Sequence, residues 1–168
     1  LAAGVLWLWF VNLFNFMDGI DGLAGIETTS IGLGLCLIGL TVPPLFAFGA
    51  IGLVLVGGAI GFLVWNWQPA RIFLGDVGSV PLGYLLGWLL LGLAASGAWA
   101  AALILPAYYL GDATLTLALR LRRGERVWQA HREHFYQQAV RGGLTHARVA
   151  TMIGLVNLAF YFQRRYFG

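Results

Sequence analysis

The chain has 168 residues, of which 60% are hydrophobic and 10% are charged, and its mean hydropathy is +0.80. Soluble domains average about 25% charged residues, so this composition excludes the ordinary soluble class and indicates a membrane protein. The net charge of +3 comes from ten arginines and no lysine, which excludes chemistry that needs a lysine amine. The only cysteine, Cys36, excludes a disulfide framework, and its apolar surroundings indicate a packing role.

Apolar segments occupy the first half of the chain, and a membrane-spanning helix needs about 20 such residues. Residues 1–11 have the composition of the last part of a spanning helix. Residues 28–70 contain no charged residue and are long enough for two spans. Since proline breaks a helix, we expect the division between these two spans at Pro43 and Pro44.

The second half of the chain continues this pattern. Residues 77–119 are long enough for two more spans, with a turn predicted at Ser96 and Gly97. Residues 149–162 predict one short last span. The predicted fold is therefore an all-α, polytopic transmembrane helix bundle with one partial span and about five fuller ones.

Three polar segments interrupt the apolar pattern, namely residues 12–25, 66–79 and 120–148, called the first, second and third polar segments below. Two predicted spans separate each from the next, so all three are expected on one side of the membrane. Seven of the ten arginines lie in the third polar segment, and the positive-inside rule makes this side cytoplasmic. The pair Arg164 and Arg165 then falls on the opposite side, against the rule.

The first polar segment carries acids and amides at three-residue intervals: Asn12, Asn15, Asp18 and Asp21. On a helix this spacing places side chains on neighbouring positions of one face. Hard oxygen donors of this kind suit Mg²⁺ or Mn²⁺ and do not suit zinc. The alternative is that the acids cap the next helix, which explains one of them but not the whole set.

The second polar segment contains Gly75, Asp76 and Ser79 in a pattern typical of a tight turn that leads into a helix. Backbone N–H groups at such a helix start can bind phosphate. Asp76 is then expected to complete the metal coordination begun in the first polar segment. An ordinary helix cap is the alternative, and Arg71 either reaches a phosphate or anchors the chain at the interface.

The third polar segment places His131 and His134 three residues apart, on one helix face. Alone, this spacing also suits an interfacial position, and zinc lacks a third or fourth ligand here. Arg126 and Arg132 either grip phosphate oxygens, as arginine does bidentately, or anchor the loop at the interface. For Asp112 three roles stay open: pairing with an arginine, bending the helix end, or contributing to the site.

Two of these segments carry motifs of a known family. The motifs are Asn12-x-x-Asn15-x-x-Asp18-Gly-x-Asp21-Gly-Leu-Ala and Phe73-x-Gly-Asp76-Val-Gly-Ser-x-x-Leu-Gly83, followed by the histidine-containing segment. The chain resembles the polyprenyl-phosphate N-acetylhexosamine-1-phosphate transferases of the glycosyltransferase 4 superfamily. The resemblance implies a bundle of ten or so membrane helices in the bacterial inner membrane, with its active-site loops in the cytoplasm. It also implies Mg²⁺, with Mn²⁺ as the alternative ion, and transfer of a sugar-1-phosphate from a UDP-sugar to undecaprenyl phosphate, with release of UMP.

The resemblance assigns roles to individual positions. Asn15 and Asp76 match the metal-binding positions of the family. The catalytic residues that we expect are Asp18, Asp21, Asp76, His131 and His134. The substrate-binding residues that we expect are Asn12, Asn15, Arg71, Gly75, Ser79, Arg126 and Arg132.

Two departures from the family pattern qualify this prediction. An acidic pair of an earlier cytoplasmic loop is absent, with about four preceding helices. We therefore expect residues 1–168 to be one membrane domain, the C-terminal part of a longer transferase, and to be inactive alone. The third polar segment reads His131-Arg-Glu-His134-Phe-Tyr-Gln, without the triple histidine of lipid I-forming enzymes. This favours synthesis of an O-antigen-like polysaccharide, with the lipid I-forming phospho-MurNAc-pentapeptide transferase as the alternative.

Two other classes of protein compete with this prediction. A CDP-alcohol phosphotransferase requires an Asp-Gly-x-x-Ala-Arg arrangement, and no arginine follows Ala24 here. A transporter with ion sites at Asp18, Asp21 and Asp112 predicts acids near the bilayer midplane and internal repeats. Most acids lie at span ends and no repeat is evident, which favours the enzyme. The expected partners are the UDP-sugar and membrane lipid, with no nucleic acid; the sequence leaves a homodimer open.

Overall fold

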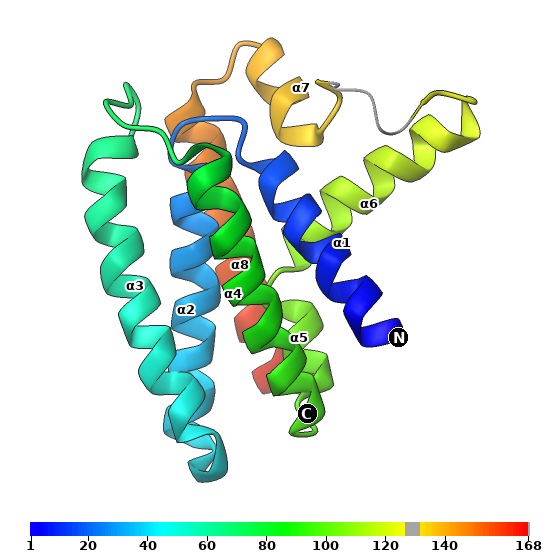
Figure 1. Ribbon diagram of the computed structural model, residues 1–168. Coiled ribbons are helices and arrows are strands. Elements are labelled where there is room, and N and C mark those ends of the chain that lie inside the picture. The colour runs from blue at the N-terminus through cyan, green and yellow to red at the C-terminus, as the bar shows by residue number, and fades with distance from the viewer. Residues whose placement is uncertain (127–131, 168) are drawn as a thin grey trace.

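The computed structural model describes residues 1–126 and 132–167, with side chains as far as residue 161. This part of the chain is helical and contains no strand, which confirms the all-α prediction (Figure 1). The helices are α1 (Ala2–Met17), α2 (Leu23–Thr41), the 3₁₀ helix η1 (Pro43–Leu45), α3 (Phe46–Asn66), α4 (Gly75–Ala95), α5 (Trp99–Ile104), α6 (Ala107–Arg122), α7 (Phe135–Arg141) and α8 (His146–Phe167). Among the described residues, three stretches are long and apolar enough to cross a membrane: α2, η1 with α3, and α4.

The α2–α3 hairpin is held together by glycines. Its break falls at Pro43 and Pro44, as predicted, because Val42 is extended and the prolines begin η1. A methyl group added at Gly52 would lie 2.6 Å from the carbonyl oxygen of Gly32, so the two backbones are already in contact. Membrane helices commonly pack through small residues in this way, because lipid offers no hydrophobic drive to join them.

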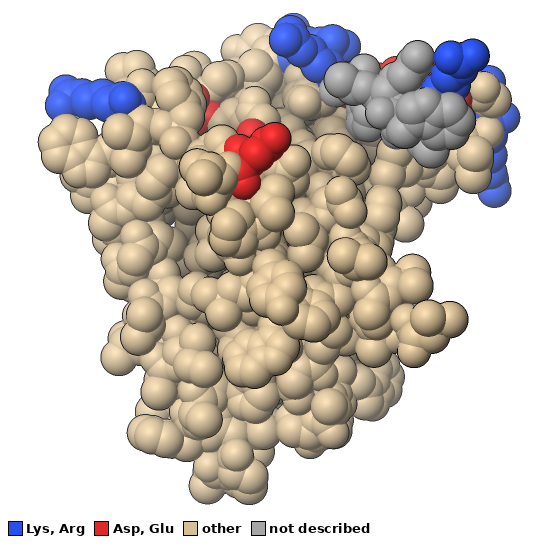
Figure 2. Space-filling model, viewed as in Figure 1, with Lys and Arg blue, Asp and Glu red and all other residues tan. Residues whose placement is uncertain are grey.

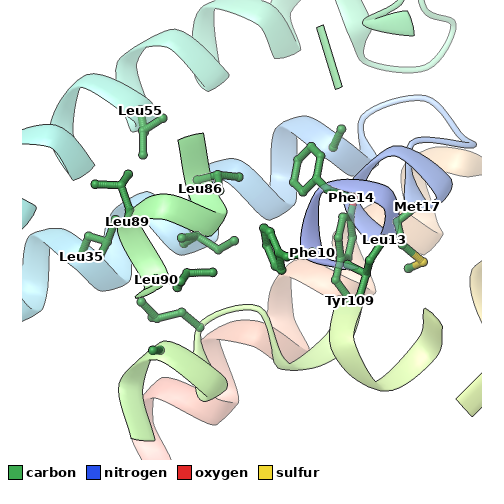
Figure 3. Packing of buried hydrophobic residues seen from close by; sticks show 14 of the residues in the cluster. Phe10, Leu13, Phe14, Met17, Leu35, Leu55, Leu86, Leu89, Leu90 and Tyr109 are labelled. Atoms are coloured by element: carbon green, nitrogen blue, oxygen red, sulfur yellow. The ribbon is translucent and has the colours of Figure 1, made fainter. Parts of the chain in front are cut away.

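A second packing unit joins α1 to α4 and α6. Its buried side chains come from all three helices and lie together in Figure 3: Phe10, Leu13, Phe14 and Met17 of α1, Leu86, Leu89 and Leu90 of α4, and Tyr109 of α6. The rings of Phe14 and Tyr109 are 5.4 Å apart between centroids. This packing fixes the position of the last turn of α1 relative to α4 and α6.

Three helix limits differ from those expected. Helix α1 continues to Met17, beyond the predicted end at residue 11, so Asn12 and Asn15 lie on this helix. The predicted span after residue 98 is divided into α5 and α6 at Pro106, which lacks an N–H for continuous helical bonding. Helix α2 begins at Leu23, five residues before the predicted start at residue 28, so Glu27 lies inside the first full span.

Glu27 is fully buried and pairs with Asn157 of α8. Its Oε2 accepts a hydrogen bond of 2.7 Å from Asn157 Nδ2. Among the described residues, Glu27 Oε1 and Asn157 Oδ1 have no hydrogen-bond partner. Both are acceptors, and a proton on the carboxyl group is the one hydrogen that would let the two side chains satisfy each other.

The three polar segments meet at one end of the bundle, as predicted. In Figure 1 the chain passes this end after α1, between α3 and α4, and around α7. On the face shown in Figure 2 the described charged side chains gather at this end and the rest of the surface is uncharged. The helices therefore carry the polar residues to a single site.

Candidate active site

Asn15 and Ser79 connect the first two polar segments. Asn15 lies in the last turn of α1, and its Oδ1 accepts a hydrogen bond from the Ser79 hydroxyl of α4. Ser79 is buried and follows Asp76 by three residues, so the two are neighbours on the surface of α4. The bond therefore holds Asn15 on the side of α4 that carries Asp76.

Asp18 and Asp76 form an acidic pair at the ends of α1 and α4. Asp18 directly follows α1, and Asp76 lies in the first turn of α4 after Gly75, whose φ of 59° is left-handed. Burial raises the pKa of the Asp18 carboxyl to about 6, and the negative charge of Asp76 adds to this. Two carboxylates that repel each other across two loops are an arrangement that a divalent cation would stabilise.

The oxygen donors at this end fit Mg²⁺. Asp18, Asp76 and Asn15 offer only carboxylate and amide oxygens, which hard cations prefer. No group of three or more His, Cys, Asp or Glu side chains suited to a metal occurs in the described part of the chain. Mg²⁺ usually takes one or two carboxylates and keeps several waters, so this small donor set suits it better than zinc.

Asp21 fastens the first polar segment to its neighbours. Its Oδ2 accepts a hydrogen bond of 3.2 Å from the Ala70 N–H, and its Oδ1 lies 3.4 Å from His146 Nδ1. The Asp21 N–H lies 3.3 Å from the same nitrogen. Neutral His146 can accept from this N–H, whereas protonated His146 pairs with the carboxylate. Asp21 thus links the first polar segment to the second one and to the start of α8. Its three-residue spacing alone did not predict this role.

Asn66, at the end of α3, is a second residue that links the first two polar segments, and this role was not predicted. It is 4% exposed, accepts from the Gly22 N–H at 2.9 Å and donates to the Ile72 carbonyl at 2.8 Å. Gly22 has a φ of 80°, which a side chain would strain. Asn66 therefore fixes both acidic loops to one helix end.

Asp112 organises the third polar segment. Its buried carboxylate on α6 accepts from His134 Nδ1 and the Phe135 N–H, each at 3.0 Å, and from the Tyr136 N–H at 3.3 Å. Of the three roles left open, pairing with an arginine is absent among its described contacts, and the observed partners belong to α6 and to the start of α7. His134 is 2% exposed, so the structure places it inside the loop and against Asp112.

A pocket of about 220 Å³ lies between the first two polar segments. Its lining comes from both loops and the end of α3: Asp18, Gly19, Ile20, Asp21, Asn66, Phe73, Leu74 and Gly75. Asp18 of the acidic pair, Asp21 and Asn66 thus border one space, and the lining ends at Gly75, directly before Asp76.

A family model described as glycosyl transferase family 4 matches residues 1–94, more than half of the chain. The chain belongs to glycosyl transferase family 4. The matched residues include the first two polar segments, with the oxygen donors Asn15, Asp18 and Asp76.

This family 4 chain is similar to curated proteins with two different names. A probable undecaprenyl-phosphate N-acetylglucosaminyl 1-phosphate transferase of Bacillus subtilis is 31% identical over 169 residues, covering 93% of this chain and 45% of that protein. A phospho-N-acetylmuramoyl-pentapeptide-transferase of Moorella thermoacetica is 41% identical over 91 residues, covering 53% of this chain and 28% of that protein. One of Streptococcus suis is 32% identical over 150 residues, covering 84% and 44%. The chain spans less than half the length of these relatives.

Several predicted site residues of the family 4 chain are exposed at the surface. Asn12 is exposed and its amide donates to the Leu8 carbonyl of its own helix, so the structure does not bring it into the site. The Arg71 guanidinium is exposed and lies 5.9 Å from the ring centroid of Trp65. Arg126 and Arg132 are exposed on the third polar segment, and His131 lies outside the described residues.

Proposed function

We propose that this chain is the C-terminal part of a bacterial inner-membrane transferase that moves a sugar-1-phosphate from a UDP-sugar to undecaprenyl phosphate. The proposal rests on one observation above the others: Asp18 and Asp76 converge at the polar end of a membrane helix bundle. Membership of glycosyl transferase family 4 supports it, since the relatives named above are sugar-phosphate transferases. The polar end would face the cytoplasm, where the arginines of the third polar segment would lie.

The reaction that this site would serve is a phosphoryl transfer. An oxygen of the lipid phosphate attacks the β-phosphorus of the UDP-sugar, the bond between the β-phosphorus and the bridging oxygen breaks, and UMP leaves with that oxygen. Such reactions need mainly positioning and charge stabilisation. A lipid phosphate needs little deprotonation near neutral pH, so a base is not the main requirement.

Several residues of the chain would divide this work. Asn15 and Asp76, with Asp18 beside them, would hold Mg²⁺, or Mn²⁺ in its place, which when bound supplies charge neutralisation for the diphosphate and for the departing phosphate. The first N–H groups of α4 would face phosphate oxygens, and Gly75 allows their close approach. Arg71, Arg126 and Arg132 would meet the remaining phosphate charge, and the apolar helix surface would accept the polyprenyl chain at about 0.8 kcal/mol per buried CH₂.

The third polar segment favours one sugar class over the other. Its sequence lacks the triple histidine of lipid I-forming enzymes, so we place the chain among enzymes that start O-antigen-like polysaccharides. A lipid I-forming activity is the second candidate, because phospho-MurNAc-pentapeptide transferases are also among its relatives.

The test is UMP release by the full-length enzyme in lipid nanodiscs. UDP-N-acetylhexosamines and UDP-MurNAc-pentapeptide are each supplied with undecaprenyl phosphate and Mg²⁺. Release with the first substrates, and a loss of about 10²–10³-fold in kcat for Asp76→Ala, is the expected result. A wild-type enzyme that releases no UMP from any of these donors, or an Asp76→Ala enzyme that keeps full activity, would overturn the proposal.

A further inference from the structure

Asp112 is a buried carboxylate that is separate from the acidic pair of Asp18 and Asp76. It is 3% exposed, and besides the three donors from the third polar segment it accepts from the Tyr108 and Thr116 hydroxyls, each at 3.2 Å. An ionised carboxylate has about four lone-pair sites, so these five donors fill its accepting capacity. A buried carboxylate so fully bonded holds the start of α7 in one position relative to α6.

Tyr136 connects α7 to the first polar segment. The residue is 1% exposed, its N–H donates to Asp112, and its hydroxyl donates to the Phe16 carbonyl oxygen at 3.2 Å. Burial, followed by the negative charge of Asp112, raises the pKa of this hydroxyl, which therefore stays a proton donor. The bond joins α7 to the last turn of α1 across 120 positions of sequence.

Gly19 of the first polar segment lies directly against Tyr136. A methyl group added there would overlap the Tyr136 hydroxyl. Gly19 follows Asp18 directly and lines the pocket between the acidic loops. The position of the Tyr136 hydroxyl therefore limits where the peptide after Asp18 can lie.

We propose that Asp112 and Tyr136 are positioning residues for the acidic pair: Asp112 fixes α7, and Tyr136 on α7 holds the turn at Phe16–Gly19 so that Asp18 stays beside Asp76. The role rests on the proposed function, since it is the transferase site that is positioned. Neither side chain touches the reacting atoms in this scheme. The rings of His134 and Tyr136 stack with 5.7 Å between centroids. Because His134 also bonds to the Asp112 carboxylate, Asp112 sets the orientation of this histidine as well.

The experiment is a double-mutant cycle on the full-length enzyme with Gly19→Ala, Tyr136→Phe and both together. Gly19→Ala pushes against the tyrosine hydroxyl and is expected to lower kcat for UMP release by about 10-fold or more, because small displacements of a site cost this much. Tyr136→Phe removes the oxygen that overlaps the methyl group and leaves ring carbons at 3.1 and 3.3 Å, so most of the clash is relieved. The double variant is therefore expected to be about 5-fold or more as active as Gly19→Ala alone, which is a coupling typical of residues in contact.

A matched control separates this coupling from general damage. Gly57 also lies in a helix bundle position but has nothing within 4 Å of an added methyl group. Gly57→Ala combined with Tyr136→Phe should show independent effects on kcat. Independent effects of Gly19→Ala and Tyr136→Phe would overturn the proposal.

A second readout keeps the inference testable apart from the transferase activity. Mn²⁺ binding to the same variants is followed by the loss of the free-ion signal in electron paramagnetic resonance. Gly19→Ala should weaken Mn²⁺ binding, and Tyr136→Phe should restore it in the double variant, even if none of the sugar nucleotides tested is a substrate. Equal Mn²⁺ affinity in wild type and Gly19→Ala would show that the contact does not position the acidic pair and would overturn the proposal.

The conservative change at Asp112 tests the other end of the same connection. Asp112→Asn keeps the shape of the side chain but turns an amide N–H₂ toward backbone donors. A fall in kcat of about 10-fold with an unchanged KM for the UDP-sugar is expected, because positioning and not substrate contact is lost. A rise in KM alone would place Asp112 in substrate binding and would contradict the positioning role.

Discussion

Asn15 and Ser79 are hydrogen-bonded to each other across α1 and α4, although 64 positions separate them in the sequence. The bond forms at the height where α1 ends and α4 begins, beside Asp18 and Asp76. It uses one lone pair of the Asn15 oxygen, so the second remains for another partner. A serine hydroxyl thus orients an amide toward the acidic pair.

Ser79→Ala is predicted to weaken this arrangement without unfolding the bundle. Loss of the hydroxyl removes one hydrogen bond and leaves the Asn15 oxygen partly unpaired, a cost of about 1 kcal/mol in the free energy of unfolding. The Mg²⁺ concentration for half-maximal UMP release should rise because Asn15 is no longer held. Ser96→Ala is the control, since the Ser96 hydroxyl donates only to the Leu93 carbonyl of its own helix, and it should leave the Mg²⁺ requirement unchanged.

The acidic pair predicts that metal affinity falls in acid. The pKa of Asp18 is raised to about 6, so at lower pH this carboxyl takes up a proton and no longer attracts a cation. Mn²⁺ affinity measured by paramagnetic resonance should therefore be full above about pH 7 and should decline as the pH falls through about 6.

Two variants assign this pH dependence. In Asp18→Asn the group that titrates is gone, so the decline near pH 6 should disappear and the affinity should be low throughout. His146 lies near the same loop, and His146→Gln should keep the decline if Asp18 causes it. A decline that is lost in His146→Gln and kept in Asp18→Asn would show that the histidine controls it.

Much of the fold was predictable because its signals are local. Hydrophobic length set the spans, Pro43 and Pro44 set the break between α2 and α3, and alternation of spans placed the polar segments at one end. The glycine and acid at positions 75 and 76 predicted a turn that leads into a helix, and α4 begins at that turn, two residues before the predicted span. These features depend on neighbours in sequence, and so the sequence displays them.

The contacts that Asn66 and Asp21 make between polar segments were not predictable, because they join residues far apart in the sequence. Asn66 bonds to a residue 44 positions away, and Asp21 contacts His146 at a separation of 125. Asn66 is a single polar residue with no repeat or motif around it, so it has no periodic signal. Asp21 belongs to a periodic motif, but the motif does not indicate the distant partner His146. Glu27 lies directly before the charge-free run that begins at residue 28, so the sequence pattern predicts that the span begins after it.

Asn66→Leu is predicted to release the first polar segment from α3. The Gly22 N–H donates to Asn66 in a buried position, and without this acceptor it is left unpaired at a cost of about 1–3 kcal/mol. Hydrogen exchange at the Gly22 amide should become faster by at least the 10-fold that corresponds to about 1.4 kcal/mol. Gln68→Leu is the comparison: it removes the acceptor of the Ala147 N–H and should speed exchange there while leaving Gly22 protected.

Glu27→Gln is predicted to be tolerated where Glu27→Leu is not. A glutamine can donate to Asn157 Oδ1 and accept from Asn157 Nδ2, as a protonated glutamate would, so the free energy of unfolding should stay close to that of the wild type. Leucine leaves the Asn157 amide buried and unpaired, at a cost of about 1–3 kcal/mol. Unfolding in mixed micelles measures both, and equal destabilisation by the two variants would contradict a protonated pair.

Gly52→Ala and Gly57→Ala, five residues apart and on different faces of α3, are predicted to have different effects on stability. A methyl group at Gly52 meets backbone atoms of α2, the Gly32 oxygen at 2.6 Å and the Cys36 nitrogen at 3.0 Å, so the helices must separate. At Gly57 the space is open, and alanine favours the helix over glycine by about 0.5–1 kcal/mol. Unfolding in mixed micelles should show a loss of about 1–3 kcal/mol for Gly52→Ala, the usual cost of overpacking, and a small gain or no change for Gly57→Ala. A similar loss in both variants would mean that the outer face of α3 is also packed against another surface, and that the glycines are needed on both faces of the helix.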